Sequence, residues 1–212
     1  DMCIVISQSG ETADTLAAMR LAKQAGAFTI AIVNVVSSTI AREADGVLYT
    51  WAGPEISVAT TKAYSAQLSA LYLISVKIAR VRGLISIGDE RALCAELQRL
   101  PECIEQTLKC QSDMQRIATL YANRSSVFFF GRGPDFASAL EASLKLKEIS
   151  YIHSEAYAAG ELKHGTISLI EEGTLVVALA TQPALFEKTV SNIREVVARG
   201  ASVVLVTTDD FT

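Results

Sequence analysis

An internal repeat without gaps constrains the fold of this chain more than any other feature. When the sequence is shifted by 174 residues, Ile4–Asn34 aligns with Ala178–Thr208, and Gly26 falls on Gly200. Each copy holds a short apolar run, a segment with apolar residues at helical spacing and a second apolar run, which is the pattern of a β-α-β unit. Two such units predict an α/β fold with parallel sheets, right-handed crossovers and helices on both faces.

The rest of the chain continues this alternation of strands and helices. The 212 residues are half hydrophobic, enough for two compact domains. We expect two flavodoxin-like domains, residues 1–86 and 87–212, with the boundary in the Gly-containing stretch Ile85–Gly88. Further strands are expected at Gly46–Thr50 and Val127–Phe130, and helices at Val58–Arg82, Asp89–Leu100, Cys103–Ala122 and Asp135–Tyr151, with Pro101 separating two of the helices.

The composition excludes several classes of protein. The net charge is −4 and no Lys/Arg-rich stripe appears, which argues against a surface that binds nucleic acid. The longest apolar stretch, between Lys62 and Lys77, is shorter than the roughly 20 residues that cross a bilayer. No secretion signal opens the chain. We therefore expect a cytoplasmic protein that makes no membrane contact.

The cysteines and histidines have no spacing typical of a disulfide framework or a metal site. We expect reduced, structural thiols and neither metal nor cofactor. The residues concerned are Cys3, Cys94, Cys103, Cys110, His153 and His164.

A polar turn separates the first expected strand from the first helix. It contains Ser7, Gln8, Ser9, Gly10 and Thr12. The carboxyl edge of an open α/β sheet is where such proteins bind ligands, and free N–H groups at a helix start favour an anion. The turn therefore predicts a phosphate site, although ordinary helix capping by Ser and Thr would explain the same residues. The second copy of the repeat lacks this turn, because Pro183-Ala184 replaces Ser9-Gly10.

The stretch Leu144–Gly165, LKLKEISYIHSEAYAAGELKHG, gathers acids, bases and both histidines. Glu141, Lys145 and Glu148 share one face of the expected helix. A salt-bridge ladder in solvent would explain that spacing. The helix is otherwise apolar, however, and follows a Gly turn, so partly desolvated Lys145 and Glu148 are candidates for moving protons.

The segment Gly160–Gly165 is expected to be a polar loop bracketed by glycines. It contains His164, whose unperturbed pKa of about 6.5 suits acid–base chemistry. A lone histidine in a loop is more often simply solvated. His153 has weaker surroundings, and we interpret it as structural.

The motifs ISQSGETADTL, TTKAYSAQL, GRG and LKLKEISYIHSEAYAAGELKHG resemble the isomerase region of the glucosamine-6-phosphate synthase family (glutamine–fructose-6-phosphate aminotransferase, isomerising). The resemblance covers nearly the whole chain. It implies two sugar-isomerase (SIS) domains, in agreement with the repeat, and formation of glucosamine 6-phosphate from fructose 6-phosphate and ammonia released from glutamine.

The resemblance also implies roles for individual residues. Ser7, Gln8, Ser9 and Thr12 match the sugar-phosphate loop, and Val58 and Thr60 match positions that line the sugar. Glu148 matches the base that moves a proton between C1 and C2 of the sugar imine, and Lys145 matches a helper for the C2 hydroxyl. His164 matches the residue for ring opening, which reaches into the site of the neighbouring subunit. We expect a homodimer in which the first domain holds the phosphate and Glu148 and Lys145 act on the carbons of the same sugar.

Several departures from the family pattern matter. Nothing matches the glutaminase domain, which would be a partner within the full-length protein. A serine-bearing phosphate turn would precede Asp1, and the Schiff-base lysine would lie beyond Thr212. Thr166 stands where a Pro is usual. We therefore expect a fragment that is inactive alone. Alternatives are a related SIS deglycase or amino-sugar deaminase, and a phosphosugar-binding module without catalysis.

Overall fold

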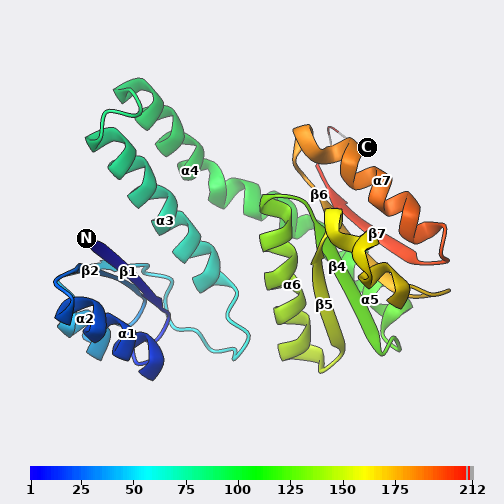
Figure 1. Ribbon diagram of the computed structural model, residues 1–212, viewed down its shortest axis with the longest axis horizontal. Coiled ribbons are helices and arrows are strands. Elements are labelled where there is room, and N and C mark those ends of the chain that lie inside the picture. The colour runs from blue at the N-terminus through cyan, green and yellow to red at the C-terminus, as the bar shows by residue number, and fades with distance from the viewer. Residues whose placement is uncertain (209, 211–212) are drawn as a thin grey trace. The chain divides into compact units, whose positions relative to one another are not determined.

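The computed structural model describes residues 1–208 and 210 of the chain. They form two compact units, Asp1–Lys109 and Cys110–Thr212 (Figure 1). Both units are parallel α/β structures, so the fold class expected from the repeat is confirmed at that level.

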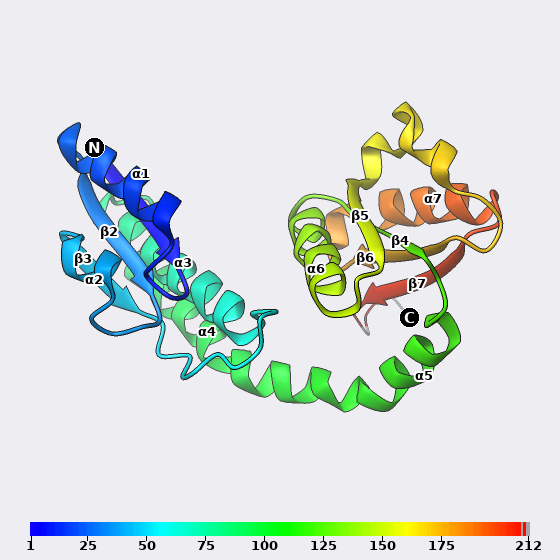
Figure 2. The ribbon, with the colours of Figure 1, turned by 90° about the horizontal axis from the view of Figure 1, so that it is seen from below.

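The first unit is built on a parallel sheet of three strands in the order β1-β2-β3. The strands are β1 (Met2–Ser7), β2 (Phe28–Val33) and β3 (Gly46–Tyr49). The helices α1 (Ala13–Gln24) and α2 (Thr39–Glu43) cover one face, and α3 (Lys62–Val81) lies against the other (Figures 1 and 2).

The core of this unit lies under α1 and α2. Met19 of α1 and Ile40 of α2 are fully buried, together with Ala31 and Val33 of β2 and the nearly buried Val5 of β1. Apolar residues on successive turns of α1 therefore meet the alternate residues of the strands that face them.

The helix expected at Val58–Arg82 is four residues shorter at its start, because α3 begins at Lys62. Residues 50–61 are irregular and are held by side-chain bonds. The Asn34 amide donates to the Gly53 carbonyl (2.7 Å) and accepts from the Ala52 amide (2.9 Å), and the Lys62 ammonium donates to the Pro54 carbonyl (2.6 Å). These bonds satisfy backbone groups that a helix would otherwise satisfy.

The expected helix break at Pro101 is wrong. A single helix, α4 (Ile87–Thr107), runs through Pro101. Proline removes only one helical N–H, and the apolar stripe Leu93, Leu97, Leu100 and Ile104 continues across it against α3. A capping box between Ser86 and Asp89 starts the helix.

The packing of α4 on α3 also places the division between the compact units after Lys109. The boundary expected at residues 86–87 falls instead in the turn between these two helices. Ile85 and Ser86 belong to the connection between α3 and α4, and Ile87 and Gly88 belong to the first turn of α4.

The second unit is built on a parallel sheet of four strands in the order β5-β4-β6-β7. The strands are β4 (Ser126–Gly131), β5 (His153–Ala158), β6 (Leu175–Ala180) and β7 (Ser202–Thr207). The helices are α5 (Gln111–Tyr121), α6 (Pro134–Ser150) and α7 (Phe186–Val197). Short 3-10 helices are η1 (Leu108–Cys110), η2 (Ala159–His164), η3 (Thr166–Leu169) and η4 (Pro183–Leu185).

Strand β4 is buried on both faces. Val127 and Phe129 pack in one cluster with Ala139 of α6, whereas Phe128 and Phe130 pack in another with Val196 of α7. This alternation places α6 and α7 on opposite faces of the sheet.

The internal repeat is confirmed in three dimensions. The unit β1-α1-β2 corresponds to β6-α7-β7, and each pair of strands is parallel. Gly26 and Gly200, which the alignment superimposes, both have positive φ, 82° and 88°. Each ends the turn after its helix in a conformation that favours glycine.

Two expectations around α6 are corrected. No strand was predicted directly after this helix, but β5 follows it and, within the described part of the chain, pairs with β4 alone. Its residues are small or polar, so its alternation is weak. The expected polar loop Gly160–Gly165 is largely η2, which the buried Leu162 anchors in the core.

Among the described residues, no helix is long and apolar enough to cross a membrane.

Candidate functional site

The polar turn between β1 and α1 is held by its own hydroxyl groups. The Ser7 side chain is buried, its Oγ lies 2.8 Å from Oγ1 of Thr12, and it accepts a hydrogen bond from the Gly10 amide (3.0 Å). The Glu11 amide donates to Oγ of Ser9 (3.2 Å). Ser7, Ser9 and Thr12, which the sequence placed at this site, therefore belong to one compact turn at the carboxyl end of β1.

Gly10 is required in this turn for two reasons. Its φ is +66°, and an added Cβ would lie 2.0 Å from Oγ of Ser38. The Ser38 hydroxyl is buried and has no hydrogen-bond partner among the described residues. Ser38 was not among the residues predicted for this site, and only its place before a short helix could have indicated it.

The start of α1 is open to a ligand. Thr12 is the N-cap residue, but its side chain makes no capping hydrogen bond. The first backbone N–H groups of a helix have no partner within the helix, so an anion is favoured there. Gln8, which is half-buried, accepts a hydrogen bond from the Asn34 amide with its carbonyl (3.1 Å), and its side chain has no hydrogen bond to any residue that the structure describes.

Glu11 would repel an anion if its carboxylate turned toward this turn. Instead, its Oε1 accepts a hydrogen bond from the Thr39 amide (2.7 Å) at the start of α2. That backbone hydrogen bond, with one from the Thr39 side chain, lowers the pKa of Glu11. The acidic side chain therefore stabilises the neighbouring helix.

Val58 and Thr60 lie in the irregular segment before α3. Val58 is 93% exposed, and Thr60 is half-buried. No hydrogen bond among the described residues joins either of them to the turn that contains Ser7. The sequence-based assignment of Val58 and Thr60 to the sugar site therefore stays a prediction.

The corresponding turn of the second copy is filled from within the chain. Asp135, at the start of α6, is 4% exposed. Its carboxylate accepts hydrogen bonds from the Thr181 amide (2.8 Å), the Thr181 hydroxyl (2.6 Å) and Nε2 of Gln182 (3.3 Å). The Thr181 and Gln182 donors that follow β6 therefore already bind the Asp135 carboxylate. The turn after β6 has these donors occupied, whereas the turn after β1 has no such internal carboxylate bound to it among the described residues.

The acidic and basic side chains expected on α6 do meet. The Lys145 ammonium lies 2.5 Å from Oε2 of Glu148 and 3.7 Å from Oε1 of Glu141. The three side chains are 19%, 30% and 25% exposed respectively, so the cluster is partly desolvated. The hydrogen bond with Glu148 raises the pKa of Lys145, against the opposing effect of burial. The result is a charged ammonium beside an accessible carboxylate.

His164 lies at the end of η2 and is exposed. No hydrogen bond or ion pair among the described residues joins it to Lys145 or Glu148. Its proposed role in a neighbouring subunit therefore stays a prediction. His153 begins β5, where its Nδ1 lies 3.2 Å from Oγ of Ser126 and its Nε2 lies 3.5 Å from Glu155. These contacts agree with the structural role expected for it.

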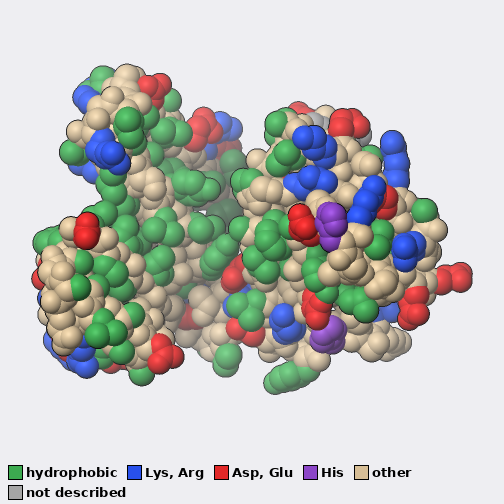
Figure 3. Space-filling model, in the orientation of Figure 1, with side chains coloured by type: hydrophobic (Ala, Val, Ile, Leu, Met, Phe, Trp, Pro, Cys, Tyr) green, Lys and Arg blue, Asp and Glu red, His purple; other side chains and the backbone are tan. Residues whose placement is uncertain are grey.

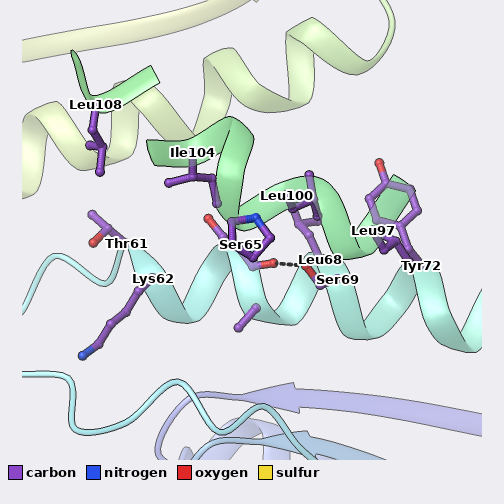
Figure 4. Close-up of a pocket in the computed structure, with 12 residues that line it drawn as sticks. Thr61, Lys62, Ser65, Leu68, Ser69, Tyr72, Leu97, Leu100, Ile104 and Leu108 are labelled. Atoms are coloured by element: carbon purple, nitrogen blue, oxygen red, sulfur yellow. Dashed lines mark hydrogen bonds between the residues drawn. The ribbon is translucent and has the colours of Figure 1, made fainter. Parts of the chain in front are cut away.

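A cavity of about 830 Å³ lies between α3 and α4 (Figure 4). Its wall is mostly apolar, with Leu68, Leu97 and Leu100 facing one another across the two helices. Such a wall offers a polar sugar phosphate few partners, so we do not assign the phosphate site to it. Within the described part of the chain, no three His, Cys, Asp or Glu residues cluster as a metal site would require.

A parallel α/β fold with a serine-rich turn between the carboxyl end of a strand and the start of a helix is an arrangement that favours binding of an anion. The model of the SIS domain matches residues 1–77 and 120–212, and this chain belongs to the SIS-domain family.

Individual relatives of known name are similar to this chain in sequence. The chain is 59% identical over 203 residues to the glutamine–fructose-6-phosphate aminotransferase (isomerising) of Caldanaerobacter subterraneus subsp. tengcongensis. It is 58% identical to the enzyme of the same name from Clostridium tetani. Each alignment covers 96% of this chain but only 33% of the relative, so the chain spans about a third of these proteins.

The solved C-terminal domain of the glucosamine-fructose-6-phosphate aminotransferase from Francisella tularensis has a TM-score of 0.95 and 38% identity, covering 98% of this chain and 59% of that one. A glucosamine-6-phosphate deaminase from Thermotoga maritima has a TM-score of 0.78 and 26% identity, covering 97% of this chain and 60% of that one.

Proposed function

We propose that this chain is the sugar-isomerising part of a glutamine–fructose-6-phosphate aminotransferase. The proposed reaction makes glucosamine 6-phosphate from fructose 6-phosphate and ammonia, which a glutaminase domain of the same full-length protein supplies. The observation that carries the proposal is the contact of 2.5 Å between Lys145 and Glu148 on α6. The high identity to relatives with this name supports it.

The proposed chemistry is a proton shift between two adjacent carbons. Glu148 takes a proton from C1 of the sugar imine and returns one to C2, because a single carboxylate can serve both carbons. Lys145 acts one step earlier, because its ammonium can give a proton to the C2 hydroxyl of the ammonia adduct, which then leaves as water and forms the imine. Its raised pKa keeps it charged near neutral pH, so it also stabilises negative charge that develops on oxygen.

Binding of the phosphate is assigned to the first unit. Ser7, Gln8, Ser9 and Thr12 surround it, with the open N–H groups at the start of α1. In this proposal Val58 and Thr60 line the sugar.

The remaining assignments concern assembly. The two parallel sheets are proposed to be two SIS domains, and the full-length protein a cytoplasmic homodimer. In that dimer His164, which is exposed, opens the sugar ring in the neighbouring subunit.

A second candidate is the reverse class of reaction, release of ammonia from an amino-sugar phosphate. The likeness to a solved glucosamine-6-phosphate deaminase favours it. Glutamine labelled at its amide nitrogen distinguishes the two in the full-length protein, because a synthase transfers that label to fructose 6-phosphate, whereas a deaminase releases ammonia from glucosamine 6-phosphate without using glutamine.

The variant Glu148→Gln in the full-length protein tests the assignment. We expect a loss of turnover of about 10²- to 10⁴-fold, the range for a general base, with binding of fructose 6-phosphate retained. Glu187→Gln, an exposed change on α7, is the matched control and should keep its turnover. Unchanged turnover in Glu148→Gln would refute the base. A protein that never turned over either substrate but bound both would instead be a phosphosugar-binding module.

A further inference from the structure

The second unit contains a small basic cavity that the proposed reaction does not use. It measures about 240 Å³ and lies between the turn after β4, η2 and α7. Three cations, Arg132, Lys163 and Lys188, line it, with Glu195 as the single acidic lining residue. Lys and Arg side chains gather over the α7 side of this unit (Figure 3). Positive charge is therefore concentrated here in a chain whose net charge is −4.

Arg132 is fixed in place by neutral groups. Its Nε and Nη2 both donate to Oδ1 of Asn192, at 3.1 and 2.9 Å, and Asn192 is only 4% exposed. Gly160 leaves room for the guanidinium, because a Cβ there would lie 3.3 Å from Nη1. No ion pair of Arg132 with a carboxylate is found among the described residues. An amide thus orients the guanidinium without neutralising its charge.

Lys163 and Lys188 differ in whether a nearby carboxylate compensates their positive charge. The Lys163 ammonium lies 2.9 Å from Oε1 of Glu195, whose other oxygen accepts from Nδ2 of Asn192 (3.4 Å). Lys188 is exposed and makes no ion pair or hydrogen bond within the described part of the chain. A carboxylate therefore partly compensates one cation, and the other two keep their charge and donors for a ligand.

We propose that this cavity is a second anion site, which takes the phosphate group of a small phosphate monoester. A preoriented guanidinium flanked by ammonium groups suits a phosphate, because it can donate two parallel hydrogen bonds. The volume lies below the roughly 300 Å³ at which pockets for drug-sized ligands begin, so a nucleotide is too large. The cavity is on the α7 side of the sheet, opposite the Lys145–Glu148 pair on α6, and the proposal stands independently of the proposed function.

Titration with inorganic phosphate, followed by nuclear magnetic resonance of the labelled chain at constant ionic strength, tests this site. We expect a saturable shift of the Arg132 Nε–Hε signal. Lys188→Gln should raise the dissociation constant roughly fivefold, the effect of one exposed charge, and a further Lys163→Gln should raise it again. Arg116→Gln on α5 removes an equal charge from the same unit and should have no effect.

The backbone signal of Gly10 reports the first phosphate turn in the same titration. A shift of the Arg132 signal that persists in Ser9→Ala supports the second site, whatever Gly10 does. A shift of Gly10 without a saturable shift of Arg132 overturns the second site and leaves the proposed function intact. A shift of Arg132 with the same dissociation constant in Lys188→Gln and the double variant overturns it too, since the lysines would then take no part.

Discussion

The Nζ atom of Lys145 lies 2.5 Å from Oε2 of Glu148, which follows it by three residues on α6. Replacing Lys145 by Met removes the ammonium and keeps most of the side-chain length. We expect turnover of the full-length protein to fall by about 10²- to 10⁴-fold, because the negative charge that develops on a sugar oxygen would no longer be stabilised by the Lys145 ammonium. Steady-state kinetics measure this effect.

Lys147→Met is the matched control for that variant. Lys147 lies on the same helix, but its ammonium donates to the Ser154 carbonyl (3.0 Å), and no ion pair with Glu148 is found among the described residues. It should cost some stability and little turnover. Equal losses in the two variants would show that Lys145 supports the helix and has no chemical role.

Asp135 is predicted to stabilise the second unit from within. Asp135→Ala leaves the Thr181 amide without its acceptor and should lower the free energy of unfolding by about 1–3 kcal/mol. Urea denaturation followed by fluorescence measures the change. Asp113→Ala on α5, whose carboxylate is 69% exposed, should change stability by less than about 0.5 kcal/mol. Similar losses in both variants would contradict the internal role of Asp135.

Variants of Gly10 test whether the close approach of Gly10 to Ser38 determines the conformation of the Ser7–Thr12 turn. Gly10→Ala and Gly26→Ala both place a side chain at positive φ, but a Cβ at Gly26 meets nothing within 4 Å. Gly26→Ala should therefore cost about 1 kcal/mol of strain. Gly10→Ala should cost more and weaken phosphate binding. Adding Ser38→Gly should restore part of the loss, and no restoration would contradict the steric explanation.

Asp45 should make the first unit sensitive to acid. Its hydrogen bonds with Lys23 and with the amide and hydroxyl of Thr29 lower its pKa from 3.8 to about 2. The charged form is thus favoured by folding, so its contribution is complete above pH 3.8 and is lost as the pH falls toward 2. We therefore expect the free energy of unfolding to depend less steeply on pH across this window in Asp45→Asn than in the unaltered chain. Thr29→Ser keeps the hydroxyl and should keep the slope, whereas an unchanged slope in Asp45→Asn would exclude this linkage.

The parts of the fold that were predictable from the sequence are those in which local pattern and tertiary packing agree. The strands β6 and β7 and the helix α7 could be expected from β1, α1 and β2, because both copies bury the same alternating apolar residues. The strand β5 could not be expected, since it is a sheet edge made of small and polar residues. Pro101 predicted a break that packing against α3 overcomes.

The residues of the candidate site likewise fall into those that were predictable from the sequence and those that were not. The Ser7–Thr12 turn and the Lys145–Glu148 pair depend on local spacing, and both form as the sequence indicated. Asp135 was missed because its donor Thr181 is distant in sequence, and Ser38 was missed because its close approach to Gly10 also joins residues far apart in the chain. Long-range contacts of this kind follow from the assembled sheet and leave no local signal.

We propose that Glu148 moves a proton between the two sugar carbons C1 and C2. The most direct measurement follows deuterium uptake at C1 and C2 of the sugar phosphate by nuclear magnetic resonance, with the full-length protein and fructose 6-phosphate in D₂O. We expect deuterium uptake with the unaltered protein and with Glu187→Gln, and none above background with Glu148→Gln at saturating substrate. Uptake at an unchanged rate in Glu148→Gln would contradict it.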